Sequence, residues 1–356
     1  MKSRLLAVFL VVALALTLFP AAAQDMMDPC LGLSAADCEI VKAADAKVAE
    51  LTSFTQSFKF NLSLSGLQTL SGLMGTTGEG APQALTITAD AANSPFVLNL
   101  AASDPMAAFA MAMDVNGSIT GTGSDDQSGT SSFVIVDGVF YAKDPETGQW
   151  MGIPLSEFLD SAGMAGLPVD PAALLEGDMG AMGAAADPTA LLAGSGLSPE
   201  DVAALMTVEG FTSQTRLADA EMMGQAMYAF ESKIDFVPLL SSQAFQNILT
   251  NLAASSDDPS MAQAGQIGMM LPMLLQEGNI KLTRWIGAND MWIHRVVVEA
   301  NVVVDLAAMM GASGGSNAPQ MEPITLRMML DVELSAHNAT VAPTAPEGAQ
   351  MMEMGS

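Results

Sequence analysis

The stretch that most constrains the fold is residues 54–64, FTQSFKFNLSL, in which apolar and polar side chains alternate. Phe58, Phe60 and Leu62 share one parity, which Gln56 alone interrupts, and polar residues fill the other. Side chains of a β-strand point alternately to opposite faces, so the pattern predicts a long strand with one apolar and one solvated face. Such strands are typical of antiparallel sheets, because parallel sheets are usually covered on both faces. What covers the apolar face is therefore the functional question.

The same alternation returns near the end of the chain, in residues 324–335. A shift of one residue in strand register would move every side chain to the opposite face, so the pattern makes a sharp forecast. We expect the apolar parity to be buried and the polar parity to be exposed. The buried set is Phe58, Phe60, Leu62, Leu326, Met328 and Leu330, and the exposed set is Lys59, Asn61, Arg327 and Asp331.

Further strands and helices are predicted between these two segments. Asp137-Gly138, between two short apolar runs, is a strong hairpin signal. A helix over 34–51, capped by Ser34, leads into the first strand. Together with short helices in the Ala-, Gly- and Pro-rich middle, about ten strands indicate an α+β protein. The later segments are strands at 207–217, 225–234, 279–286 and 292–304 and a helix at 239–252.

Residues 1–23 have the three parts of an export signal. Lys2 and Arg4 supply a positive start, an apolar run follows, and Ala21 to Ala23 fit a small-residue cleavage site. The apolar run is short for a membrane span, which favours a cleaved signal over a retained anchor. We therefore expect a secreted or extracytoplasmic protein of the cell envelope, cleaved near Ala23.

Charge is strongly unbalanced, with 12 Lys and Arg against 39 Asp and Glu. Removal of Lys2 and Arg4 with the signal takes the net charge from −27 to −29. This excess of negative charge argues against nucleic acid and against an anionic membrane surface as partners. The acidic residues form no long tract, so a solvated acidic surface is the simplest interpretation.

The two cysteines, Cys30 and Cys38, lie close together near the expected mature N-terminus. Two nearby cysteines in an exported chain predict one local disulfide, which we expect to fix the entry to the first helix. A metal or redox role is the alternative, but the spacing is not CxxC and no histidine is near.

Five phrases of the sequence, taken in order, are similar to those of a known family: SFTQSFKFNLSL, VIVDGVFYAKDPETGQWMGIP, VEGFTSQTRLADAEMMGQAMYAFESKID, IKLTRWIGANDMWIHRVVVEANV and ITLRMMLDVELSAHNATVAPTAP. They resemble the LolA-like fold, in particular the exported lipid and lipoprotein carriers of the LppX/LprG type. In that family a curved antiparallel sheet forms a half-barrel, helices close its concave face, and acyl chains lie between them. The resemblance implies the same α+β half-barrel here, over residues 38–347.

The resulting domain division is simple. Residues 24–347 are expected to form a single domain with helical insertions near 154–206 and 239–277. The tail, 348–356, is expected to be disordered. The sequence departs from the LppX/LprG pattern because no cysteine follows the signal directly, so we expect no lipid anchor at the N-terminus.

Residues suited to catalysis or metal binding are scarce. His294 and His337 are the two histidines, and a structural role fits both better than general-base catalysis. The sequence has no GxSxG, HExxH or P-loop motif, and its acidic turns do not match the calcium loop of an EF-hand. We therefore expect no enzyme, no cofactor and no metal site.

Methionine is unusually frequent, with 28 residues. Its flexible, polarizable side chain suits a surface that must fit several apolar shapes, such as a lipid cavity. Ordinary core filling explains the count equally well. Ligation of Cu(I) by thioethers is a third interpretation, but the methionine clusters lack nearby His or Cys.

Two functions from different classes remain open. The first is an exported carrier of a lipid or other apolar ligand, with a membrane or a partner carrier protein as donor or acceptor. The second is a non-enzymatic structural or interaction module whose core is filled by its own side chains. An apolar cavity between sheet and helices would discriminate between them. The predicted cavity lining is Phe58, Phe60, Leu62, Tyr228, Phe230, Val296 and Val298.

Overall fold

The computed structural model describes residues 30–68, 84–99, 102, 104–121, 126–161, 204–205, 207–255, 270–306 and 322–352. The expected signal, 1–23, lies outside these ranges. So do most of the predicted helical insertion at 154–206 and part of the one at 239–277. All strands and helices named here lie within the described ranges.

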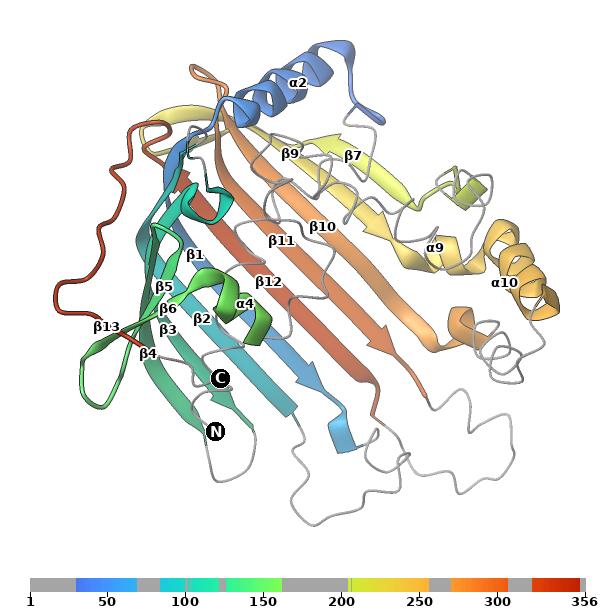
Figure 1. Cartoon of the computed structure of the whole chain (residues 1–356). Coiled ribbons are helices and arrows are strands. Elements are labelled where there is room, and N and C mark those ends of the chain that lie inside the picture. Colours follow the sequence, from blue (N-terminus) through green and yellow to red (C-terminus); the bar gives the residue numbers. More distant parts are fainter. Residues whose placement is uncertain are drawn as a thin grey trace.

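One large curved sheet dominates the protein, and its two edge strands do not pair with each other (Figure 1). The strands run in the order β13-β6-β5-β4-β3-β2-β1-β12-β11-β10-β9-β7, and β8 pairs with β9. Every pairing is antiparallel except that of β13 with β6. The strands are β1 (Ser53–Ser65), β2 (Ala84–Leu98), β3 (Phe109–Thr120), β4 (Gln127–Val136), β5 (Val139–Lys143), β6 (Trp150–Pro154), β7 (Thr212–Arg216), β8 (Ala220–Met222), β9 (Gln225–Asp235), β10 (Leu275–Gly287), β11 (Ile293–Val304), β12 (Ile324–Ser335) and β13 (Gln350–Met351).

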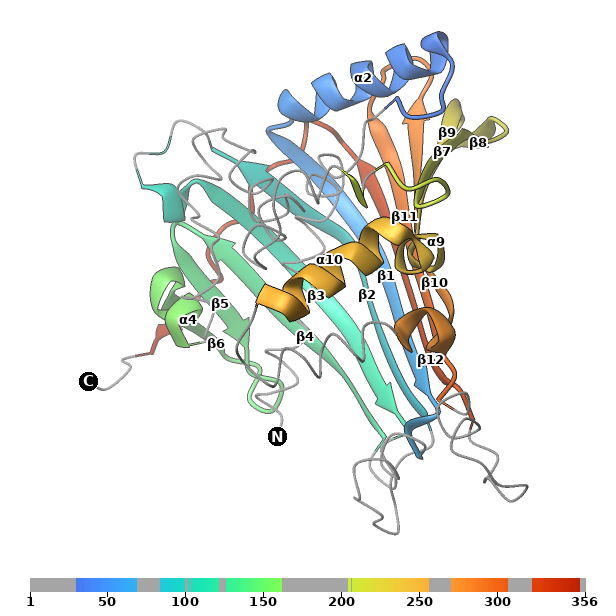
Figure 2. The same cartoon turned by 90° about the vertical axis from the view of Figure 1, so that its right-hand side faces the viewer.

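Helices lie on the concave side of this sheet (Figure 2). α2 (Ala35–Ala49) crosses one end of the sheet, which we call the α2 end; the opposite end is the far end. The expected α+β half-barrel, with helices packed on its concave face, is therefore confirmed. Further helices are α4 (Leu155–Ser161) beside β5 and β6, α9 (Phe236–Ser241) beside β10, and α10 (Gln243–Ser255), with the 3-10 turn η1 (Pro105–Ala107).

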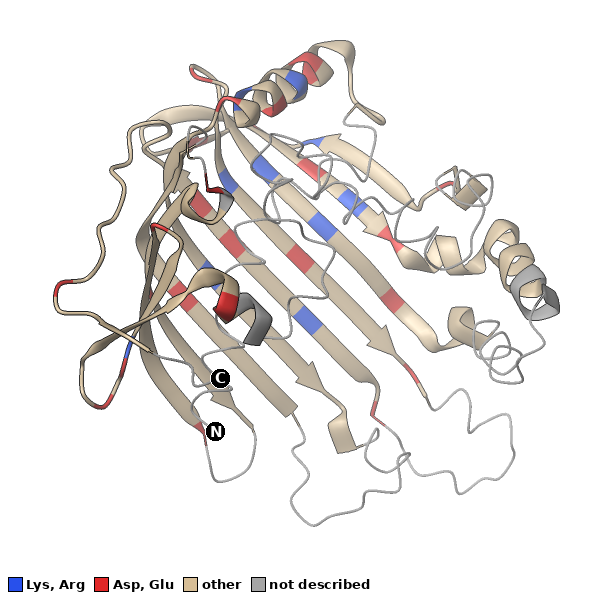
Figure 3. Cartoon of the chain, viewed as in Figure 1, with Lys and Arg blue, Asp and Glu red and all other residues tan. Residues whose placement is uncertain are grey.

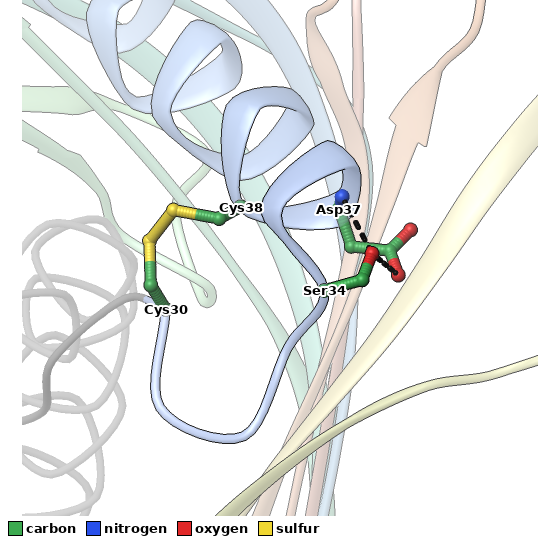
Figure 4. The surroundings of a disulfide bond; sticks show 4 residues. All are labelled: Cys30, Ser34, Asp37 and Cys38. Carbon is green, nitrogen blue, oxygen red and sulfur yellow. Dashed lines mark hydrogen bonds between the residues drawn. A yellow bond between two sulfur atoms is a disulfide. The ribbon is translucent and has the colours of Figure 1, made fainter.

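The start of α2 is fixed by a cap and by a disulfide (Figure 4). The Ser34 hydroxyl accepts a hydrogen bond from the backbone N–H of Asp37, as expected of an N-cap residue. Cys30 and Cys38 are bonded, with their Cα atoms 5.0 Å apart. The bond ties the residues before α2 to its first turn, as the sequence predicts.

The long strands β1 and β12 lie next to each other at the centre of the sheet. Phe58 lies opposite Val332, and Phe60 lies opposite Leu330. The two alternating segments of the sequence therefore place their apolar parities on the same face. This face carries the main core, which α2 joins through Val41 and Ala44.

Residues 348–352 differ from the predicted disordered tail. Gln350 and Met351 form β13, which pairs with Met151 and Gly152 on the edge strand β6. The backbone N–H of Met352 also donates to the Gly152 carbonyl, at 2.8 Å. The edge of β6 offers unpaired backbone groups, and pairing with them explains why this short segment forms a strand. Residues 353–356 lie outside the described part.

Candidate functional site

Strand register places the predicted lining residues on the concave face. Phe58 lies opposite Val332, which lies opposite Val296; Val296 lies opposite Arg284, which in turn lies opposite Phe230. Residues directly opposite each other in a sheet share a face, so this row crosses five strands on one side. The other predicted residues lie in three neighbouring rows of the same face. Phe60 and Val298 share one row, Leu62 lies in the next, and Tyr228 lies opposite Ile286 in the third.

Burial of these residues changes along the strands. Phe58, Phe230, Val296 and Val298 are between 1% and 3% exposed. Phe60, Leu62 and Tyr228 are only half-buried. Along β1 the concave face is therefore more covered at Phe58, towards the α2 end, than at Phe60 and Leu62, towards the far end. Tyr228 is half-buried although it lies towards the α2 end.

The predicted face of each side chain on β1 and β12 is correct, but not all of these side chains are as buried or as exposed as predicted. Phe58 and Leu330 are buried, and Lys59 and Arg327 are exposed. The remaining six residues are half-buried rather than fully buried or exposed. These six are Phe60, Leu62, Leu326 and Met328 on the apolar side, and Asn61 and Asp331 on the polar side.

The row that contains Leu62 is the clearest feature of the far end. Over seven strands, from β3 to β9, its members are all apolar and half-buried, and it ends at the polar residues Gln127 of β4 and Thr212 of β7. Half-exposed apolar side chains on a continuous surface mark a contact site more often than isolated ones do. The row consists of Ile119, Ile87, Leu62, Met328, Ala300, Ile280 and Ile234.

The row that contains Phe60 lies next to the row of Leu62, and small residues occupy it on β2, β3 and β4. Phe60 lies opposite Ala89, Ala89 opposite Gly117, and Gly117 opposite Gly129. A Cβ atom added at Gly129 would meet no other atom within 4 Å. The surface next to the half-buried apolar row is therefore open at this position.

Arg284 is a charged residue on the covered part of this face, with 4% of its surface exposed. Its Nη1 donates to Asp45 of α2 at 3.1 Å. Burial lowers the pKa of Arg284, and the Asp45 carboxylate opposes that change. The Arg284 Nε has no hydrogen-bond partner among the described residues.

Arg284 was not predicted from the sequence, although a signal for it is present there. Ile280, Leu282 and Ile286 share a parity in β10, and Arg284 interrupts it. A basic residue on the apolar parity of a strand requires a buried partner, because an unpaired charge in a core is costly. The pattern does not say which element supplies that partner.

A second arginine lies over the aromatic pair of β9. Arg216 pairs with Asp37 of α2 and with Asp219. Its Cζ lies 4.7 Å from the Tyr228 ring centre and 5.1 Å from that of Phe230. Arg216 therefore covers part of the predicted lining and links it to α2.

The opposite face of the sheet is polar. Figure 3 shows acidic and basic residues interspersed along the strands. Arg295 forms a two-pronged ion pair with Asp331, at 2.8 and 2.7 Å, which explains why Asp331 is only half-exposed. Asn116 donates to Asp90 at 3.1 Å and accepts from Thr130 at 2.8 Å. These contacts are those of a solvated surface, so an apolar ligand would find its surface on the concave side.

Groups for metal chemistry do not gather in the described part of the chain. It holds no cluster of three or more His, Cys, Asp or Glu that could bind a metal ion. Asp144, which stands in an acidic turn, uses its Oδ1 to accept hydrogen bonds from the backbone N–H groups of Glu146 and Thr147. No helix in these ranges is long and apolar enough to cross a bilayer.

Comparison with known proteins gives distant structural matches. No protein-family model matches the sequence, and no curated protein matches it. Among solved structures the chain is similar to LprF from Mycobacterium bovis, at 15% identity and a TM-score of 0.35, over 87% of this chain and 96% of that one. It is similar to the Mycobacterium tuberculosis lipoprotein LppX, at 11% identity and a TM-score of 0.28, over 85% and 95%.

A LolA-superfamily protein from Nitrosomonas europaea matches at 9% identity and a TM-score of 0.14, over 87% of this chain and 94% of that one. The names of LppX and of this LolA-superfamily protein are those of the group that the sequence phrases resemble. With TM-scores of this size, the description of the fold rests on the strand order and register given above.

Proposed function

We propose that this protein is an exported carrier that holds a lipid or another apolar ligand against the concave face of its half-barrel. The observation that carries the proposal is the apolar, half-buried row through Leu62, next to the open position at Gly129. A filled core would bury such a row. The resemblance to LolA-like carriers, stated from the sequence, supports the same function.

The energetics favour an acyl chain as the occupant. Each methylene that leaves water contributes about 0.8 kcal/mol. A chain of about fourteen carbons offers on the order of 10 kcal/mol before the cost of ordering it, which is enough for binding without a specific polar contact. Of the seven predicted lining residues, the half-buried Phe60, Leu62 and Tyr228 would contact the ligand, and the buried Phe58, Phe230, Val296 and Val298 would support them. A membrane or a partner carrier would supply and receive the ligand.

A pair of substitutions on adjacent residues of β1 tests the proposal. Leu62→Asp places a carboxylate in the half-buried apolar row, where it has no cationic partner opposite it. Ser63→Asp adds the same charge to the polar face, opposite Arg327. We expect Leu62→Asp to abolish uptake of a fluorescent fatty acid and Ser63→Asp to leave it unchanged.

The readout is ligand fluorescence, with circular dichroism to show that both variants fold. Equal uptake by the two variants would contradict the proposed binding surface. Failure of the unmodified protein to take up any of several lipid classes would favour the structural or interaction module instead.

A further inference from the structure

The two histidines of the chain, far apart in sequence, meet at the α2 end of the sheet. His294 belongs to β11, and His337 lies in the turn after β12. Their ring centres are 4.9 Å apart in an edge-to-face arrangement. Trp292 stacks on His337, also at 4.9 Å and nearly parallel, and the Lys47 Nζ of α2 lies 5.5 Å from the Trp292 ring centre.

Each imidazole ring uses its Nε2 for a hydrogen bond. The His337 Nε2 lies 3.0 Å from the Ile293 carbonyl oxygen and therefore donates to it. The His294 Nε2 lies 3.0 Å from an Asp290 carboxylate oxygen, while its Nδ1 is buried without a partner among the described residues. A further proton on the half-buried His337 ring would thus add a positive charge beside the buried His294 ring.

The turn that holds His337 also fastens α2 to the sheet. The next residue, Asn338, accepts a hydrogen bond from the Thr52 backbone N–H at 2.7 Å through its Oδ1. Its Nδ2 donates to the Glu50 carbonyl at 3.0 Å, and its own N–H donates to the Ser53 carbonyl at 2.7 Å. Asn338 therefore bridges the junction between the end of α2 and the start of β1.

Two titratable groups act on His337 from neighbouring elements: β11 supplies His294, and the turn between β10 and β11 supplies Asp290. Lys47 of α2, which pairs with Glu50 at 2.6 Å, lies over the Trp292 ring that stacks on His337. Burial lowers the pKa of His337 from its ordinary value of 6.5, and His294 lowers it further. Asp290 and the bond to Ile293 oppose this change without cancelling it.

We infer that His337 makes the junction between α2 and β1 sensitive to pH, so that acidification loosens the cover over the concave face. The sign follows from linkage. Because the pKa of His337 is lower in the folded junction, the opened junction binds more protons, and the closed form loses stability as pH falls below about 6.5. Histidine is the side chain suited to such a change near neutral pH, and an exported protein meets the pH of its surroundings.

Hydrogen exchange measures this opening without any ligand, so its outcome is independent of the proposed carrier function. Exchange at residues 44–53 is compared at pH 7.5 and pH 5.5, after correction for the intrinsic pH dependence. Wherever opening takes up one proton, the opening constant rises about tenfold per pH unit. We expect faster corrected exchange at pH 5.5 in the unmodified protein and a pH-independent rate in His337→Gln, whose amide can still donate to Ile293.

Two further variants test whether the pH response depends on His337 itself. His337→Phe keeps the stacking on Trp292 without a titratable group, so it must also lose the pH response; it serves as the test if His337→Gln does not fold. His294→Gln is the matched control for the other ring. A pH response that survives in both His337 variants, or that vanishes only in His294→Gln, would overturn the assignment to His337.

Discussion

At the scale of single residues, Arg284 and Asp45 form one of the ion pairs that tie α2 to the covered part of the concave face. The Arg284 side chain is 5% exposed and that of Asp45 is 24% exposed. Loss of one partner of a buried ion pair leaves an uncompensated charge, which is far more costly than the pair itself is stabilising.

Asp45→Asn should therefore lower the free energy of unfolding by roughly 3 kcal/mol, the lower end of the range for a broken buried pair, since Asp45 keeps contact with water. Unfolding in guanidinium chloride measures the change. Glu39→Gln, an exposed charge change on the same helix, is the control and should have almost no effect. Recovery of stability in the double variant Asp45→Ala/Arg284→Leu is expected; no recovery would contradict the account of the pair.

Gly129 tests the binding surface without removing any core side chain. A leucine at this position would extend into the open space of the concave face and displace about two methylenes of a bound chain. At ~0.8 kcal/mol each this weakens fatty-acid binding about tenfold. Ser128→Leu, on the opposite face of the same strand, is the control. A titration with fluorescent fatty acid in which both variants bind equally would place the ligand elsewhere.

At the scale of elements, local sequence pattern predicts the strands and turns well. The alternating parities of β1 and β12 give their shared face, and Asp137-Gly138 forms the turn between β4 and β5 with positive φ angles of 52° and 72°. The cap at Ser34 likewise follows from neighbouring residues. Each of these features depends on residues close in sequence, and this is why the sequence suffices.

Features that depend on distant segments were not predictable in the same way. Burial of the apolar parity depends on what lies over each row, so the forecast gave the face but missed the half-burial of Leu62 and Met328. The Arg284–Asp45 contact joins β10 to α2, and β13 depends on the free edge of β6. The meeting of His294 with His337 likewise follows from strand order, which periodicity does not give.

The disulfide before α2 gives a prediction at this scale. Labelling of the unreduced protein with a thiol reagent should find no free cysteine, because Cys30 and Cys38 are bonded. In the chain-entropy model, reduction should cost about 2–3 kcal/mol of stability, since the closed loop is short. Two reactive thiols in the unreduced protein would contradict the structure at the start of α2.

At the scale of the whole molecule, the sheet has two chemically distinct faces. The convex face carries interspersed charges and paired polar side chains, as at Arg295 and Asp331. The concave face is apolar from Phe58 to Leu64 along β1, with helices on its side of the sheet. A half-barrel of this kind can shield an apolar ligand from water and remain soluble through its acidic surface.

The most direct test of the carrier function is native mass spectrometry of the protein purified from its own host. If the protein is a carrier, it should show additional mass from a co-purifying apolar ligand, and extraction with organic solvent should remove this mass. Repeated preparations that show only the mass of the polypeptide, from a host whose lipids are intact, would contradict the claim that the concave face holds a ligand.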